Sequence, residues 1–238
     1  MGAEKNMNNT TGNKDKAATR AVFFDLDGTL IDSIPVLFDN YNAFLARYGC
    51  HGSQEEFKFV NGPALPEIIK HLKQNHNIQG TEEEIMAVYN NGLEENYRDV
   101  VGPREKADET IAELRRRGYR LSLVTSTHLP LVSVILKRLG WESVFDAIIT
   151  GDTVERAKPE PDIYLAALAE AGSEGAKTAA VEDSPNGTRS AAAAGCRAVS
   201  LAIETPVELL QNAGAEFIIS SLDELPDLID SFFEGEAE

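Results

Sequence analysis

Short apolar runs alternate with longer helical patterns along most of this chain, and this alternation limits the possible folds more than any other feature. The apolar runs lie at 21–24, 119–124, 145–149, 178–181, 197–201 and 217–219. Between successive runs are helical patterns, each followed directly by glycine, at 104–117, 130–139, 160–171 and 185–194. Near-continuous apolar runs are typical of strands buried on both faces, and glycine commonly ends a helix. The sequence therefore predicts an α/β fold with a doubly wound parallel sheet and right-handed crossovers.

One stretch, residues 33–100, interrupts this alternation because it contains only helical patterns. The patterns lie at 35–48, 64–74 and 81–98, and the breaks between them contain Gly or Asn. We interpret the stretch as an all-helical domain inserted after the first strand, with hinges near Ser33 and Gly102. The remaining segments, 20–32 and 101–238, then form the α/β core.

The charge of the chain limits its partners. Lys and Arg number 22 against 39 Asp and Glu, which gives a formal net charge of −17. Such a field repels nucleic-acid phosphates and anionic lipid, and no apolar run approaches the ~20 residues of a membrane helix. We therefore expect no nucleic acid and no membrane as partner.

Two further features bear on the surroundings of the protein. Cys50 and Cys196 are far apart and match no zinc or disulfide pattern, so we expect a reducing, cytoplasmic location. Residues 1–19 are polar and show no apolar periodicity, so we expect a disordered tail there. We expect a monomer or a weak homodimer.

The first strand leads directly into a pair of acids. Asp25 and Asp27 are alternate residues of an extended segment, so both side chains can point off the carboxyl end of the strand together. Converging carboxylates repel each other and attract a hard cation, for which Mg²⁺ is suited. Gly28 allows a tight turn, and Thr29 offers a hydroxyl. Taken alone, the motif is explained as well by an Asp-Gly turn with two solvated acids.

Three later segments supply chemistry to the same edge of the sheet. The second strand ends at Thr125-Ser126-Thr127, where a hydroxyl and backbone N–H groups can hold an anion. Lys158-Pro159 follows the third strand, and the fourth ends in Glu182-Asp183-Ser184. Because parallel strands bring their carboxyl ends to one edge, this set indicates a magnesium-and-phosphate site.

These segments, in this order, resemble the four motifs of the haloacid dehalogenase superfamily. The resemblance rests on residues 25–33, Thr125, Lys158-Pro159 and Glu182-Asp183-Ser184, and it spans about residues 20–220. It implies a Rossmannoid core, and the helical insertion is similar to the C1 cap that closes over the active site in this family. The chain looks most like the branch of phosphoglycolate phosphatases and β-phosphoglucomutases.

The resemblance also implies a role for each site residue. Asp25 is expected to be the nucleophile that forms an aspartyl-phosphate, and Asp27 the general acid that later activates water. The phosphate-binding residues are expected to be Gly28, Thr125, Ser126 and Lys158. The Mg²⁺ ligands are expected to be Asp25, Asp27 through its backbone carbonyl, Asp183 and Glu182, the last as a ligand or a supporting acid.

The expected activity is Mg²⁺-dependent hydrolysis of a small phosphorylated metabolite, a sugar phosphate or a phosphoglycolate-like monoester. A β-phosphoglucomutase-like mutase remains open, although mutases of this branch typically carry an Arg in the cap loop, and the corresponding residues 60–65 contain none. A catalytically weak, phosphate-binding regulatory protein also remains open. Five cap cations are expected to be solvated charges on helix faces: Arg47, Lys58, Lys70, Lys73 and Arg98. His128 follows the Thr125 loop and could touch the leaving group, but it is expected instead to cap the helix at 130–139.

Overall fold

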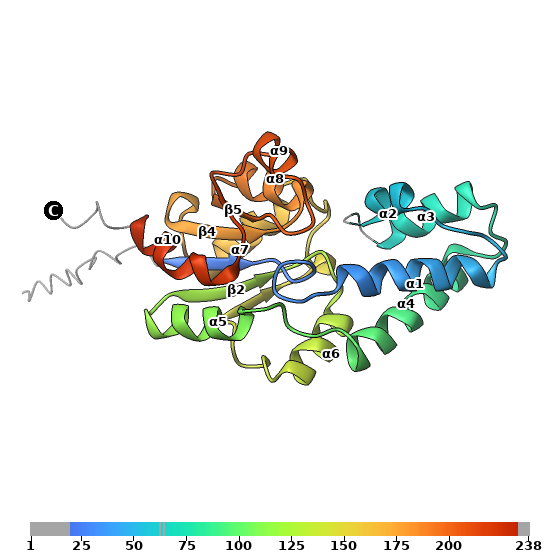
Figure 1. Cartoon of the computed structure of the whole chain (residues 1–238), viewed down its shortest axis with the longest axis horizontal. Helices are drawn as coiled ribbons and strands as arrows, with labels where there is room; N and C mark the ends of the chain where they lie inside the picture. Colours follow the sequence, from blue (N-terminus) through green and yellow to red (C-terminus); the bar gives the residue numbers. More distant parts are fainter. Residues whose placement is uncertain (1–19, 62, 64, 233–238) are drawn as a thin grey trace, which may run out of the picture.

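The core of the protein is a six-stranded sheet in which every pair of neighbours is parallel (Figure 1). The computed structural model describes residues 20–61, 63 and 65–232, so the predicted tail at 1–19 lies outside the described residues. The strand order is β3-β2-β1-β4-β5-β6. The strands are β1 (Ala21–Phe24), β2 (Arg120–Val124), β3 (Ala147–Ile149), β4 (Thr178–Glu182), β5 (Arg197–Leu201) and β6 (Phe217–Ile219). This confirms the predicted doubly wound parallel sheet.

The helices divide into a group around the sheet and a group beyond its edge (Figure 1). The first group comprises α5 (Ala107–Arg116), α6 (Leu129–Leu139), α7 (Asp162–Ala171), α8 (Pro185–Ala193), α9 (Val207–Asn212) and α10 (Leu225–Ser231). The second comprises α1 (Ile34–Arg47), α2 (Gln54–Val60), α3 (Leu65–Asn75) and α4 (Glu82–Asp99). Short 3-10 turns complete the described chain at Gly151–Thr153, Gly175–Lys177 and Leu222–Glu224. No helix among the described residues is both long and apolar enough to cross a membrane.

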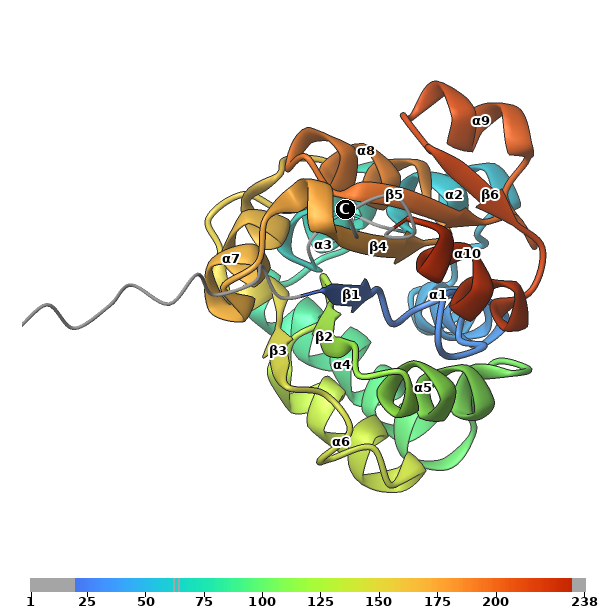
Figure 2. The same cartoon turned by 90° about the vertical axis from the view of Figure 1, so that its left-hand side faces the viewer.

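The central strand β1 is buried on both faces, as its apolar composition predicts. Val22 and Phe24 belong to the cluster that includes side chains of α5, α6 and α10, whereas Ala21 and Phe23 belong to the cluster formed with α7 and α8. Figure 2 shows these two helix groups on opposite sides of the sheet. The alternation follows from the two-residue period of a strand.

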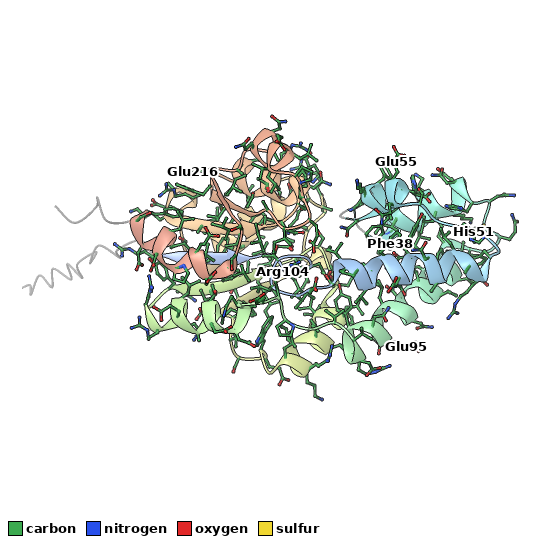
Figure 3. The ribbon with its side chains drawn as sticks, in the orientation of Figure 1. Phe38, His51, Glu55, Glu95, Arg104 and Glu216 are labelled. Atoms are coloured by element: carbon green, nitrogen blue, oxygen red, sulfur yellow. The ribbon has the colours of Figure 1, made fainter. Side chains whose placement is uncertain are left out.

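The structure differs from the sequence prediction at the start of α5 and over α2. The helix predicted from residue 104 begins at Ala107, because Arg104 donates its backbone N–H to Leu30 O (2.8 Å) and its buried guanidinium lies 3.7 Å from Asp32 and 3.5 Å from Glu204. Figure 3 shows Arg104 between the core and the second helix group. The helix α2 was not predicted, although Ser53 caps it by accepting the N–H of Glu56 (3.0 Å).

The second helix group has an apolar interior that continues from one face of the sheet. Helices α1 and α4 pack together, and the ring of Phe38 on α1 meets the ring of Phe57 on α2 edge-on at 5.0 Å (Figure 3). The chain enters and leaves this group side by side, because the N–H of Asp32 donates to Gly102 O (3.0 Å). We expect the hinges near Ser33 and Gly102. Gly102 accepts this hydrogen bond, and Ser33 follows its donor, Asp32.

Candidate active site

Lys158 draws three strand ends together at the carboxyl edge of the sheet. Its buried ammonium donates to Asp25 Oδ1 (2.7 Å), to Glu182 Oε1 (2.6 Å) and to the carbonyl of Val124 (3.1 Å). Asp25 is held in register with β4 by its own N–H, which donates to Val181 O (3.0 Å). These three bonds use all three N–H donors of the ammonium. Lys158 is thus a fixed positive charge beside Asp25.

Three carboxylates surround this single cation. One oxygen from each of Asp25, Glu182 and Asp183 lies within 4.8 Å of the other two, and all three residues are buried. The positive charge of Lys158 offsets only one of the three negative charges. Hard oxygen ligands crowded in this way fit a divalent cation such as Mg²⁺. The cluster is therefore a candidate metal site.

The pKa values of these groups follow from burial and from their neighbours. Burial and the charge of Glu182 raise the pKa of Asp183 to about 7, against a hydrogen bond from Thr29 that lowers it. Burial also raises the pKa of Asp25 well above its usual range, although Lys158 opposes this effect. Burial opposes the charge of Lys158, but Asp25 and Glu182 outweigh it and raise the Lys158 pKa. Without a metal, burial therefore favours the protonated forms of Asp25 and Asp183.

Gly28 and Thr29 form the turn that supports Asp183. Gly28 has φ +84°, a backbone conformation that residues with a side chain rarely adopt. A Cβ at this position would also collide with Asp183 Oδ2, at 2.2 Å. The Thr29 hydroxyl donates to Asp183 Oδ1 (3.2 Å). Gly28 was expected among the phosphate-binding residues, and its N–H donates to Ile31 O (3.0 Å). Gly28 therefore contributes close packing against Asp183, and its own N–H is used within the turn.

Asp27 is held from both sides by hydroxyl groups. Thr127 Oγ1 donates to Asp27 Oδ2 (2.6 Å), and the Tyr97 hydroxyl on α4 donates to Asp27 Oδ1. Burial and the nearby Asp27 charge raise the pKa of Tyr97 well above its usual range, so this hydroxyl stays protonated and donates. Neither partner was predicted. Tyr97 gave no sequence signal, because it reads as one position of helix α4, and only the packing of this helix on the core brings it to Asp27.

The predicted residues converge on one cavity of about 140 Å³ between the sheet edge and the helices α1 to α4. Six of them line it: Asp25, Asp27, Thr125, Ser126, Lys158 and Asp183. Thr125 Oγ1 accepts the N–H of Thr127 (3.0 Å), which leaves its own hydroxyl hydrogen to donate to a ligand. Gly28 and Glu182 do not line the cavity.

Glu182 lies behind the cavity wall, where it accepts hydrogen bonds from neighbouring side chains. It is 1% exposed, and its Oε1 accepts from both Lys158 and the Tyr164 hydroxyl, each at 2.6 Å. A Cβ on Gly187 would lie 1.9 Å from Glu182 Oε2, so this glycine makes room for the carboxylate. Tyr164 was also missed by the sequence analysis, in which it appeared only as part of a helical pattern.

The expected role of His128 was wrong. His128 occupies the N-cap position of α6 without a capping hydrogen bond from its side chain. The carboxylate of Asp152 accepts the N–H of Leu129 instead (3.2 Å), and His128 Nδ1 lies 3.4 Å from that carboxylate. Because Asp152 satisfies the helix end, the imidazole is left at the cavity wall, which it lines.

Comparison with known proteins agrees with this geometry. The sequence model of the family described as haloacid dehalogenase-like hydrolase matches residues 22–201, most of the chain. The chain belongs to the haloacid dehalogenase-like hydrolases. The match contains all the residues that carried the resemblance, and it confirms the prediction of a hydrolase of this family.

Three similar proteins illustrate the range within these hydrolases. The pyrophosphatase PpaX of Bacillus velezensis is 30% identical over 191 residues, which cover 79% of this chain and 85% of the relative. Hexitol phosphatase A of Escherichia coli is 26% identical over 208 residues, or 87% of this chain and 93% of the relative. The crystal structure of CbbY from Rhodobacter sphaeroides with phosphate matches with a TM-score of 0.76 at 28% identity, over 87% of this chain and 96% of that chain. Two of these three are named a pyrophosphatase and a phosphatase, which confirms a phosphatase at the level of the family. Similar solved structures also include a protein of Thermotoga maritima described as a putative β-phosphoglucomutase, at 25% identity and a TM-score of 0.73 over 90% of this chain and 99% of that chain.

Proposed function

We propose that the protein is a Mg²⁺-dependent phosphomonoesterase that acts on a small phosphorylated metabolite through an aspartyl-phosphate at Asp25. The observation that carries this proposal is the buried cluster of Asp25, Glu182 and Asp183 around Lys158, in which Asp25, Asp183 and Lys158 line a cavity that Asp27 also lines. A carboxylate that attacks a phosphate dianion must overcome like-charge repulsion, and a buried lysine with a divalent cation supplies the required opposite charge.

The proposed steps use groups in their observed places. Asp25 attacks phosphorus, while Lys158 offsets the negative charge that gathers there and Thr125 donates its hydroxyl to a phosphoryl oxygen. Asp27 acts as the general acid for the leaving oxygen and then as the general base for the water that hydrolyses the intermediate. Asp25, Asp183 and the backbone carbonyl of Asp27 would hold Mg²⁺, and the ion would supply charge neutralisation there. Glu182 holds Lys158 in place.

We propose that residues 33–100 form the cap that shields this chemistry. We also propose that the reaction is hydrolysis rather than the transfer of a phosphoryl group within the substrate, as in a mutase. A mutase must bind the second phosphate of its intermediate through a cation, and no cap Lys or Arg is among the described residues that line the cavity. In the loop at 60–65, Gly62 and Ala64 lie outside the described residues, and neither has a charged side chain. A weak, regulatory binder is disfavoured because the full set of reactive groups is in place. The cytoplasmic location and the monomer or weak homodimer remain predictions.

The proposal is tested by trapping the intermediate. Wild-type protein is mixed with Mg²⁺ and phenyl phosphate, quenched in acid, and examined by peptide mass spectrometry for a phosphoryl group on the peptide that contains Asp25. The label should be absent with EDTA and in Asp25→Asn, which retains the shape but not the nucleophile. Rapid phosphate release from Asp25→Asn would show that the covalent step does not occur.

A further inference from the structure

The part of the cavity remote from Asp25 is built from uncharged side chains. Helices α1 to α4 and the loop after α2 contribute the apolar ones, including Leu37, Phe57, Val60, Leu65, Ile68 and Leu93. Tyr89, Asn61 and Asn90 are the neutral polar groups of this part. A leaving group bound above Asp25 therefore meets aliphatic and aromatic surface with a few neutral hydrogen-bonding groups.

Charged side chains that line the described cavity all come from the core. Asp25, Asp27 and Asp183 are acids, and the ammonium of Lys158 already has three acceptors. His128 lies at 3.4 Å from the carboxylate of Asp152. An anionic leaving group would thus lose its hydration without gaining an unshared cation, which is costly.

The cap cations lie elsewhere in the part of the chain that the structure describes. None lines the cavity, and the set comprises Arg47, Lys58, Lys70, Lys73 and Arg98. The Lys73 ammonium donates to Gly80 O (2.7 Å), and Arg98 lies 3.7 Å from Glu94 on the same helix. The first three are exposed. The net charge of −17 makes the surroundings still less favourable for a second anion.

One polar atom in the neutral wall lacks a partner. Asn90 lines the cavity, and its Oδ1 is buried and accepts no hydrogen bond from the described protein groups. A buried carbonyl oxygen that is left without a donor costs free energy, so it favours a ligand that brings one. A hydroxyl group on the leaving alcohol supplies such a donor.

We propose that the substrate is the monophosphate of a small, uncharged alcohol, with an apolar portion against the wall of Leu37, Phe57 and Leu93 and a hydroxyl that donates to Asn90 Oδ1. This inference rests on the proposed phosphomonoesterase function and specifies its substrate class. Monoesters whose leaving group carries a carboxylate or a second phosphate fall outside the class, as does pyrophosphate. A cavity of about 140 Å³ accommodates a small alcohol.

Four three-carbon probes test the class by phosphate release with saturating Mg²⁺. They are propyl phosphate, 3-hydroxypropyl phosphate, 2-carboxyethyl phosphate and propanediol bisphosphate. We expect kcat/KM for the two uncharged leaving groups to exceed that for the two charged ones by about tenfold or more, with 3-hydroxypropyl phosphate the best. Equal or higher kcat/KM for a charged leaving group would overturn the inference while leaving the phosphomonoesterase in place. Release from none of the four would refute the phosphomonoesterase itself, and the inference with it.

A pair of variants on α4 tests the hydrogen bond. Asn90→Leu should bring the ratio of kcat/KM between 3-hydroxypropyl phosphate and propyl phosphate down to about one. The matched control is Asn91→Leu, because Asn91 is the next residue and is exposed, and this variant should keep the wild-type ratio. Urea unfolding of both variants shows whether each is folded. An unchanged ratio in folded Asn90→Leu would remove Asn90 from the proposal.

Discussion

Asp183 should make the metal-free protein less stable as the pH rises. Its pKa is raised from 3.8 to about 7 in the folded protein, chiefly by burial, so the folded state holds this proton more tightly than the unfolded chain does. The resulting contribution to stability is complete below about pH 4 and is lost as the pH rises through about 7. A pKa difference of about 3 units corresponds to ~4 kcal/mol in the free energy of unfolding. Mg²⁺ should reverse the loss, since the ion binds the charged carboxylate of the folded state.

The assay is urea unfolding at several pH values between about 5 and 8, in EDTA and in Mg²⁺, for wild type and Asp183→Asn. The variant removes the titrating group and keeps an oxygen to accept the hydrogen bond of Thr29 (3.2 Å in the wild type). In EDTA, wild type should lose stability relative to the variant as the pH rises, and Mg²⁺ should stabilise wild type more at pH 8 than at pH 5. If Asp183→Asn is the less stable protein in EDTA at pH 8, the charge of Asp183 is already compensated and the reasoning fails.

Three further substitutions have defined outcomes. Asp25→Asn should retain the fold by circular dichroism and lower kcat by about a thousandfold or more, because an amide cannot form the acyl phosphate. Lys158→Met should lower the unfolding free energy in EDTA by ~3 kcal/mol, since it leaves Asp25 and Glu182 as uncompensated buried acids. Tyr97→Phe should lower kcat by about tenfold with little change in KM, because the hydroxyl contacts Asp27. If the Tyr97 variant lost as much free energy of unfolding in urea as its fall in kcat corresponds to, the hydroxyl would have a structural role only.

The floor of the site was predictable because topology alone places it. Asp25, Thr125, Lys158 and Asp183 each follow a strand, and parallel strands bring such positions to one edge whatever their separation along the chain. Asp25 and Lys158 are 133 residues apart and meet at 2.7 Å. The order of elements was therefore sufficient, and no knowledge of side-chain packing was needed.

The upper part of the site was not predictable, because it depends on how the inserted helices pack on the core. Tyr97 reads in the sequence as one apolar position of a helix, and only the tertiary arrangement brings it to Asp27. The same holds for Asn90, which is an ordinary polar position until the packing buries its oxygen. The start of α5 was misplaced for a similar reason, since Arg104 is bound to Leu30 and is held outside the helix.

Helix α4 connects recognition of the leaving group to the proposed proton transfer. Asn90, Leu93 and Tyr97 all line the cavity, and their spacing of three and then four residues places them on one face of the helix. In the proposals above, Asn90 and Leu93 meet the leaving alcohol, while Tyr97 holds the acid that must protonate the same alcohol's oxygen. The leaving group and Asp27 therefore contact the same helix, while the other oxygen of Asp27 is bound to Thr127 of the core (2.6 Å). Asp27 thus lies between a donor on α4 and a donor beside the sheet edge, so in these proposals one helix both contacts the alcohol and positions the acid.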